Sequence, residues 1–63
     1  MYAFEVTSNH GTALLKNEDD AIHALWLIGL YHDFDINHDV VKKALDGKGY
    51  YEKFPISIVK TES

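Results

Sequence analysis

Residues 24–31 form a run without a charged side chain, inside a segment whose apolar spacing predicts a helix over residues 18–33. At 100° per residue this helix has two nearly opposite apolar faces. The first contains Ala21, Ile22, Leu25, Ile28 and Gly29, and the second contains His23, Leu27, Leu30 and Phe34, with Trp26 and Tyr31 at the flanks. We expect the first face to pack on a sheet, with Gly29 allowing close approach. A surface helix needs only one apolar stripe, so the second face requires cover from the next helix, another subunit or both.

Alternating apolar residues predict a strand near the N-terminus. The alternating positions are Tyr2, Phe4 and Val6. Residues 8–11 then have the composition of a turn, in which Gly11 takes a left-handed conformation. Residues 12–16 follow as a returning strand, with Leu14 or Leu15 facing inward. This part of the chain is therefore predicted to form a β-hairpin.

Two asparagines mark predicted helix starts. Asn17 precedes three acidic residues, and its side-chain oxygen and those acids all suit the N-terminus of a helix. Asn37 likewise precedes a shorter helix that ends at Gly47. The apolar stripe of this second helix consists of Val40, Val41, Ala44 and Leu45. Ile36 and Val41 have the spacing of a hydrophobic staple across its start.

The alternation of Phe54, Ile56 and Ile58 predicts a third strand. Pro55 is expected at its start or on a sheet edge, because proline cannot donate a ladder hydrogen bond. The predicted order is strand, strand, helix, helix, strand. We therefore expect an α+β fold in which two to three antiparallel strands form a single layer with two helices on one face. Residues 1–63 are expected to form one domain.

Size and composition favour association. A domain of 63 residues buries only about 60% of the surface that its unfolded chain exposes. The chain has no cysteine for a disulfide or a thiolate metal site, and oligomerisation is another common source of stability. The start of the sequence lacks the pattern of a signal peptide, and no apolar run approaches the roughly 20 residues that span a bilayer. We therefore expect a cytoplasmic protein that does not bind membranes.

Charge is unevenly distributed along the chain. Residues 1–39 carry seven acids and one lysine, a net charge of −6, whereas residues 40–63 carry five lysines and three acids, a net charge of +2. There is no arginine, the side chain best suited to bidentate contacts with bases and phosphates. Nucleic acid is therefore disfavoured as a partner. Two alternatives stay open: an acidic nucleic-acid mimic that inhibits a DNA- or RNA-binding protein, and weak nucleic-acid binding through the Lys- and Tyr-rich C-terminal half.

Residues 32–39 are the segment richest in potential metal ligands. Asp33, Asp35 and Asn37 match the start of a calcium loop, but His38 and Ala44 stand where that loop needs glycine and a bidentate glutamate. Helix ends and a turn explain the same residues, so we assign no metal and no cofactor. A metal module within residues 32–39 is kept as an alternative. The chain has no cysteine nucleophile, no glycine-framed serine and no phosphate-binding loop, and we expect no enzymatic activity.

These observations predict a small non-enzymatic interaction or regulatory protein that acts through an apolar helix face and forms a homodimer. The predicted interface residues are His23, Trp26, Leu27, Leu30, Tyr31 and Phe34. A secondary recognition patch is predicted at Lys48, Tyr50, Tyr51 and Lys53, because aromatic rings beside lysines suit stacking contacts. The expected partners are a second copy of the chain and a larger target protein.

Overall fold

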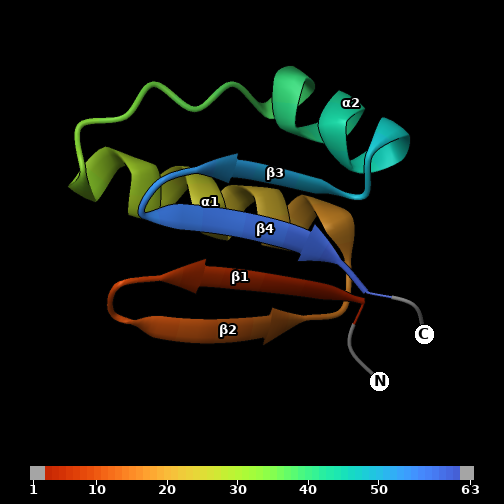
Figure 1. Cartoon of the computed structure of the whole chain (residues 1–63), viewed down its shortest axis with the longest axis horizontal. Helices are drawn as coiled ribbons and strands as arrows, with labels where there is room; N and C mark the ends of the chain where they lie inside the picture. Colours follow the sequence, from red (N-terminus) through yellow and green to blue (C-terminus); the bar gives the residue numbers. More distant parts are fainter. Residues whose placement is uncertain (1–2, 62–63) are drawn as a thin grey trace.

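The chain folds into one antiparallel β-sheet with helices packed against it. A computed structural model describes residues 3–61, in which the elements are β1 (Phe4–Ser8), β2 (Gly11–Leu15), α1 (Glu18–Tyr31), α2 (His38–Gly47), β3 (Tyr50–Lys53) and β4 (Ile56–Lys60). Figure 1 shows α1 behind the sheet and α2 alongside β3 at the upper border. The α+β class is confirmed, and so is the predicted order of elements as far as the second helix.

The described residues form a sheet of four strands in the order β2-β1-β4-β3, which corrects the predicted two to three strands. The expected third strand is a hairpin, in which Lys53 pairs with Ile56 across a turn at Phe54 and Pro55. Phe54 was predicted to belong to one strand with Ile56 and Ile58, but it is 86% exposed, whereas both isoleucines are fully buried. The prediction was wrong for Phe54 because this residue lies in a turn, where a side chain is held to neither face of the sheet. Pro55 directly precedes β4, as predicted.

The N-terminal hairpin forms as predicted over the described residues, and Tyr2 lies outside them. Ser8 pairs with Gly11, whose φ of +134° lies in the region that favours glycine. Phe4 is buried in β1, and Leu15 of β2 packs against the core. Leu14 points to the opposite face of the sheet and is 48% exposed. The inward-facing leucine of β2 is therefore Leu15.

Asparagine side chains start both helices, as predicted. The side-chain oxygen of Asn17 accepts a hydrogen bond from the backbone N–H of Asp20 at 2.8 Å. The side-chain oxygen of Asn37 accepts from the backbone N–H groups of Asp39 at 2.8 Å and Val40 at 3.2 Å. These bonds satisfy amides that have no partner within the helix, so each helix start is fixed by local sequence.

The chain reverses after α1 so that Ile36 seats against Gly29. The helix ends at Tyr31 rather than at residue 33, because Asp33 adopts a φ of +60° and the amide of Phe34 donates to the carbonyl of Gly29 at 2.7 Å. A Cβ atom on Gly29 would lie 2.5 Å from Cγ1 of Ile36, which is itself buried. The close approach expected at Gly29 therefore exists, but its partner is the linker rather than the sheet.

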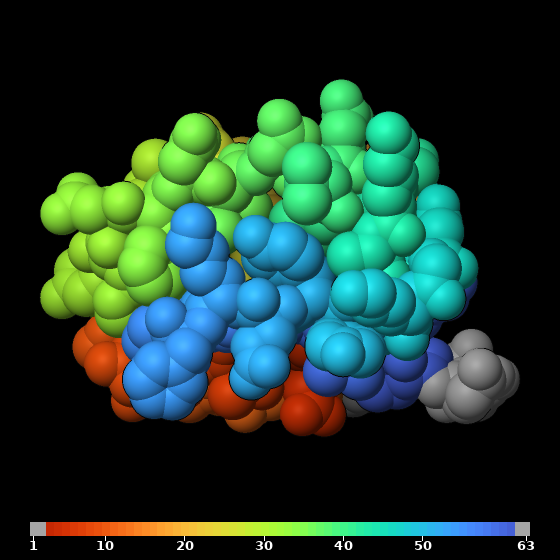
Figure 2. All heavy atoms as spheres, turned by 45° about the horizontal axis from the view of Figure 1, so that its top comes forward, coloured from red at the N-terminus to blue at the C-terminus, as the bar shows by residue number. Residues whose placement is uncertain are grey.

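The first apolar face of α1 forms the centre of the core. The core residues are Phe4, Val6, Ala21, Ile22, Leu25, Ile36, Val41, Leu45, Ile56 and Ile58. The linker and α2 lie against β3 and conceal most of α1 when the molecule is seen from that side (Figure 2). Neither helix of residues 3–61 combines the length and the apolar composition needed to cross a lipid bilayer. The expected cytoplasmic location stays a prediction.

Candidate interaction surface

The second apolar face of α1 is left open by the rest of the described chain. Leu27 and Leu30 are 50% and 51% exposed, and Tyr31 is 76% exposed. The second helix packs along one flank of α1, where the ring of Trp26 lies 6.0 Å from that of His38. Cover for this face was expected from the next helix, from another subunit or from both. The next helix, α2, does not cover these three side chains.

Two of the six predicted interface residues, Trp26 and Phe34, are partly buried within the chain. Trp26 packs against the core, and its ring stacks on that of His23 at 5.5 Å. Phe34 lies beyond the end of α1, where its ring stacks on His32 at 5.6 Å and lies 5.2 Å from the ammonium nitrogen of Lys53. The surface named here the α1 face consists of the exposed residues His23, Leu27, Leu30 and Tyr31.

The structure brings three of the four residues of the predicted secondary patch to one hollow and places the fourth elsewhere. Tyr50 lies on the outer face of the sheet, away from the helices, and is 48% exposed. Tyr51, the next residue, points to the helix side and packs against the core, because successive side chains of a strand alternate between faces. Lys48 lies at the end of α2, near the start of β3, and Lys53 lies at the opposite end of β3. Lys48, Tyr50 and Tyr51 therefore line one hollow beside the start of β3, together with Ala44 and Glu52, and Lys53 lies apart from them.

Over the described residues, the outer face of the sheet carries three exposed apolar side chains, of which Tyr50 alone was predicted to take part in recognition. Leu14, Val59 and Tyr50 are each 42–48% exposed. In the register of the sheet, Glu5 pairs with Leu14 on one side and with Val59 on the other, and Val59 pairs with Tyr50. One row across the sheet therefore has a carboxylate between its apolar members. Only the strand pairing reveals this row, because its residues come from all four strands.

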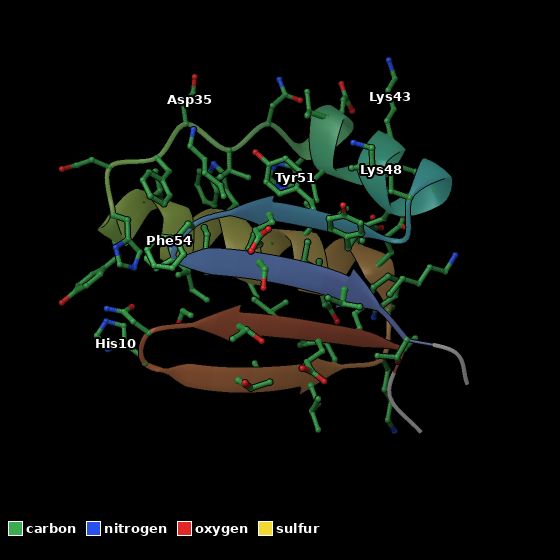
Figure 3. The ribbon with its side chains drawn as sticks, viewed as in Figure 1. His10, Asp35, Lys43, Lys48, Tyr51 and Phe54 are labelled. Carbon is green, nitrogen blue, oxygen red and sulfur yellow. The ribbon has the colours of Figure 1, made fainter. Side chains whose placement is uncertain are left out.

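Aromatic and imidazole rings gather at one end of the molecule. The ring of His10, in the turn before β2, lies 5.5 Å from that of Tyr31 and 6.3 Å from that of His32. Figure 3 shows Phe54, in the turn before β4, at the same end. Nε2 of His32 is buried without a hydrogen-bond partner among the described residues. No local sequence pattern predicts this group, since its members are brought together by two separate turns.

Residues 3–61 contain no group of three His, Asp or Glu side chains placed to hold a metal ion. The segment considered as a metal module supplies the C-cap of α1, the linker and the N-cap of α2 instead. Its residues therefore have structural roles in this fold.

Acidic side chains are spread over both layers of the molecule. Glu18 and Asp20 lie in the first turn of α1, Asp33 lies at the other end of that helix, and Glu5 lies on the outer face of the sheet. The ion pair of Glu18 with Lys42 spans 3.8 Å between partly exposed side chains, so it contributes little. A nucleic-acid mimic needs its acids on one continuous surface, which this distribution does not favour.

No known protein family matches the chain, and no curated protein or solved structure is significantly similar to it. The surfaces described above are therefore the basis on which a function is proposed.

Proposed function

We propose that this protein is a non-enzymatic interaction protein that forms a homodimer through the α1 face. The observation that carries the proposal is the exposure of Leu27, Leu30 and Tyr31, by 50%, 51% and 76%, on one helix of a small domain. Burying such side chains between two copies removes apolar surface from water, at about 25 cal/mol per Å². Association then supplies stability that a domain of this size has difficulty reaching alone.

The charge pattern of α1 supports a second copy as the occupant. Residues 21–32 carry no charged side chain, whereas the first turn carries three acids, at Glu18, Asp19 and Asp20. In an antiparallel pair of α1 helices related by a twofold axis, the uncharged segments meet and the two acidic turns lie at opposite ends. The contact is thus self-complementary, with the uncharged segments at its centre.

The outer face of the sheet is the competing surface for self-association, and its charge argues against it. Two copies that pack through this face would bury Glu5, which lies between Leu14 and Val59 in the row across the sheet. The described lysines do not pair with this carboxylate, and burial of an unpaired charge is costly. The α1 face contains no carboxylate that would be buried in this way.

The test is the molar mass by light scattering over a hundredfold range of protein concentration. We expect a dimer for the natural chain and a monomer for Leu27→Lys and Leu30→Lys. Val40→Lys is the matched control, because Val40 is 52% exposed but lies on α2. Circular dichroism verifies that each variant is folded. A natural chain that remains monomeric throughout, or variants of Leu27 and Leu30 that dimerise like the Val40 control, would overturn the proposal.

The proposed dimer leaves the sheet accessible to a further protein. A regulatory protein that binds and masks a target needs a binding surface outside its dimer interface. The two edges of the sheet lie outside the proposed interface.

A further inference from the structure

The two edges of the sheet are protected to different degrees. An exposed edge strand presents unpaired backbone N–H and C=O groups that pair readily with another chain. The β3 edge is short, carries Glu52 and Lys53, and has α2 and the linker against it (Figures 1 and 2). The β2 edge has five residues, Gly-Thr-Ala-Leu-Leu, without a charge or a proline. Figure 1 shows no helix behind β2. Among the described residues, β2 is therefore the less protected edge.

A groove runs between β2 and α1 on the helix side of the sheet. Ala13 lies on this side because it pairs with the buried Val6, and paired residues share a face. Gly11 lies on the same side two residues earlier, so β2 presents two small residues to the helix layer before Leu15. The resulting hollow has a volume of about 330 Å³ and is also lined by Ser8 and Ile28. Its walls carry no acidic side chain and no lysine.

We propose that β2 and this groove bind an extended segment of a partner protein. The segment adds a fifth strand to the sheet at β2, and its large apolar side chains, at alternate positions, fill the hollow beside Ile28. Main-chain hydrogen bonds to the edge provide affinity, and the groove selects bulky uncharged residues on one side of the added strand. The volume lies at the lower end of the range for ligand pockets, which suits one or two side chains rather than a whole small molecule.

A second copy is the poorer occupant of this edge. If β2 of another copy were added, it would present Gly11, Ala13 and Leu15 to the helix side, so two of its three inward positions would be small and would leave part of the hollow empty. A partner strand with leucine-sized residues at those positions fills the same space. Its side chains then make dispersion contacts with the walls that an empty hollow lacks. Leu27 of the α1 face does not line the β2 site, which adjoins that face where the ring of His10 lies 5.5 Å from that of Tyr31.

The test uses a fluorescent peptide of about eight residues, in which leucine and threonine alternate between one lysine at each end. Binding is followed by fluorescence anisotropy and by the backbone amide signals of the protein in NMR spectra. A peptide of the same composition with its leucines consecutive is the control for charge and hydrophobicity. We expect the alternating peptide to bind more tightly and to shift the amide signals of residues 11–15 before those of β3. Equal binding of both peptides, or shifts centred on β3 rather than on β2 and the groove, would overturn the proposal.

Two leucine substitutions test whether the groove takes part in binding. Ala13→Leu fills the hollow from within, whereas Thr7→Leu places the same side chain on the outer face of β1, away from the groove. We expect Ala13→Leu to weaken peptide binding at least about tenfold and Thr7→Leu to change it less than about twofold. Equal effects of the two would refute the groove as the site.

The Leu27→Lys variant distinguishes this proposal from that of the dimer. It is expected to bind the peptide as the natural chain does, whether or not the natural chain dimerises. Loss of peptide binding in this variant would contradict the separation of the two sites. Concentration-dependent shifts confined to β2 without peptide would instead place a second copy there and overturn the proposal.

Discussion

Replacing Gly29 with alanine is expected to destabilise the fold, although alanine is the better helix former. Removing a glycine from a helix interior by itself stabilises by about 1 kcal/mol. The new methyl group would lie 2.5 Å from Cγ1 of Ile36, well inside the optimal separation of about 3.5–4.0 Å between carbon atoms. Ile36 is 3% exposed, and Cγ1 lies in the middle of its side chain. The contact is therefore relieved only if the linker or the neighbouring core moves.

The two effects have opposite signs, so their sizes decide the outcome. Overpacking of a buried site costs about 1–3 kcal/mol. Weighed against the gain of about 1 kcal/mol in helix propensity, Gly29→Ala is expected to lower the free energy of unfolding by about 0–2 kcal/mol. For a domain of this size, a loss of 1 kcal/mol lowers the melting temperature by about 4–8 °C. Helix propensity alone predicts a higher melting temperature for Gly29→Ala instead.

Three further substitutions isolate the contact. Gly47→Ala, at the end of α2, places its Cβ where no atom lies within 4 Å, so unchanged or slightly raised stability is expected. Ile36→Val retains both γ-carbons, so Gly29→Ala remains destabilising in that background. Ile36→Ala removes them, at a cost of about 2–5 kcal/mol, and Gly29→Ala is expected to be stabilising there.

Urea unfolding at one fixed protein concentration, followed by Trp26 fluorescence and circular dichroism, gives the free energy of each variant. Sulfate in every sample keeps the weakest variant folded. We expect a coupling of about 2 kcal/mol between positions 29 and 36, within the usual range for residues in contact. If Gly29→Ala stabilises the natural chain as much as it stabilises the Ile36→Ala chain, the reasoning is refuted.

Three other predictions concern the effects of single substitutions on the free energy of unfolding, which is measured in urea. Asn37→Ala removes the acceptor for two amides of α2 and is expected to cost about 1 kcal/mol, whereas Asn37→Asp retains it; equal losses would contradict the cap. Lys42→Ala is expected to change stability by less than about 0.5 kcal/mol, and a larger loss would show that its 3.8 Å pair with Glu18 is stronger than its exposure implies. Leu45→Ala is expected to cost about 2–5 kcal/mol because Leu45 is 1% exposed, and Leu14→Ala, at 48%, far less; similar losses would contradict the burial assigned to them.

The candidate site was only partly predictable from the sequence. Leu27, Leu30 and Tyr31 were selected because the run of apolar residues exceeds what one buried stripe needs, and all three are exposed. Phe34 was placed on the same face by continuing the helical period, but the helix ends at Tyr31, and Phe34 packs on His32. The groove beside β2 had no sequence signal, since it arises from the position of α1 over the sheet.

The sheet, too, was only partly predictable from the sequence. Phe54 matched the period of Ile56 and Ile58, but it lies in the turn that joins β3 to β4. The tyrosines of β3 formed no alternating pattern of their own, so this strand was not predicted. Its pairing with β4 gives Tyr50 and Tyr51 opposite faces, which a linear cluster of aromatic residues does not reveal.

The sequence by itself determined the features that depend on neighbouring residues. The caps at Asn17 and Asn37, the glycine conformation at Gly11 and the buried stripe of α1 all follow from side chains within a few positions of one another. The tertiary structure alone decided the strand order β2-β1-β4-β3, the seating of Ile36 on Gly29 and which apolar side chains remain exposed. These depend on contacts between distant segments, whose free energies come from packing and surface burial that no local pattern encodes.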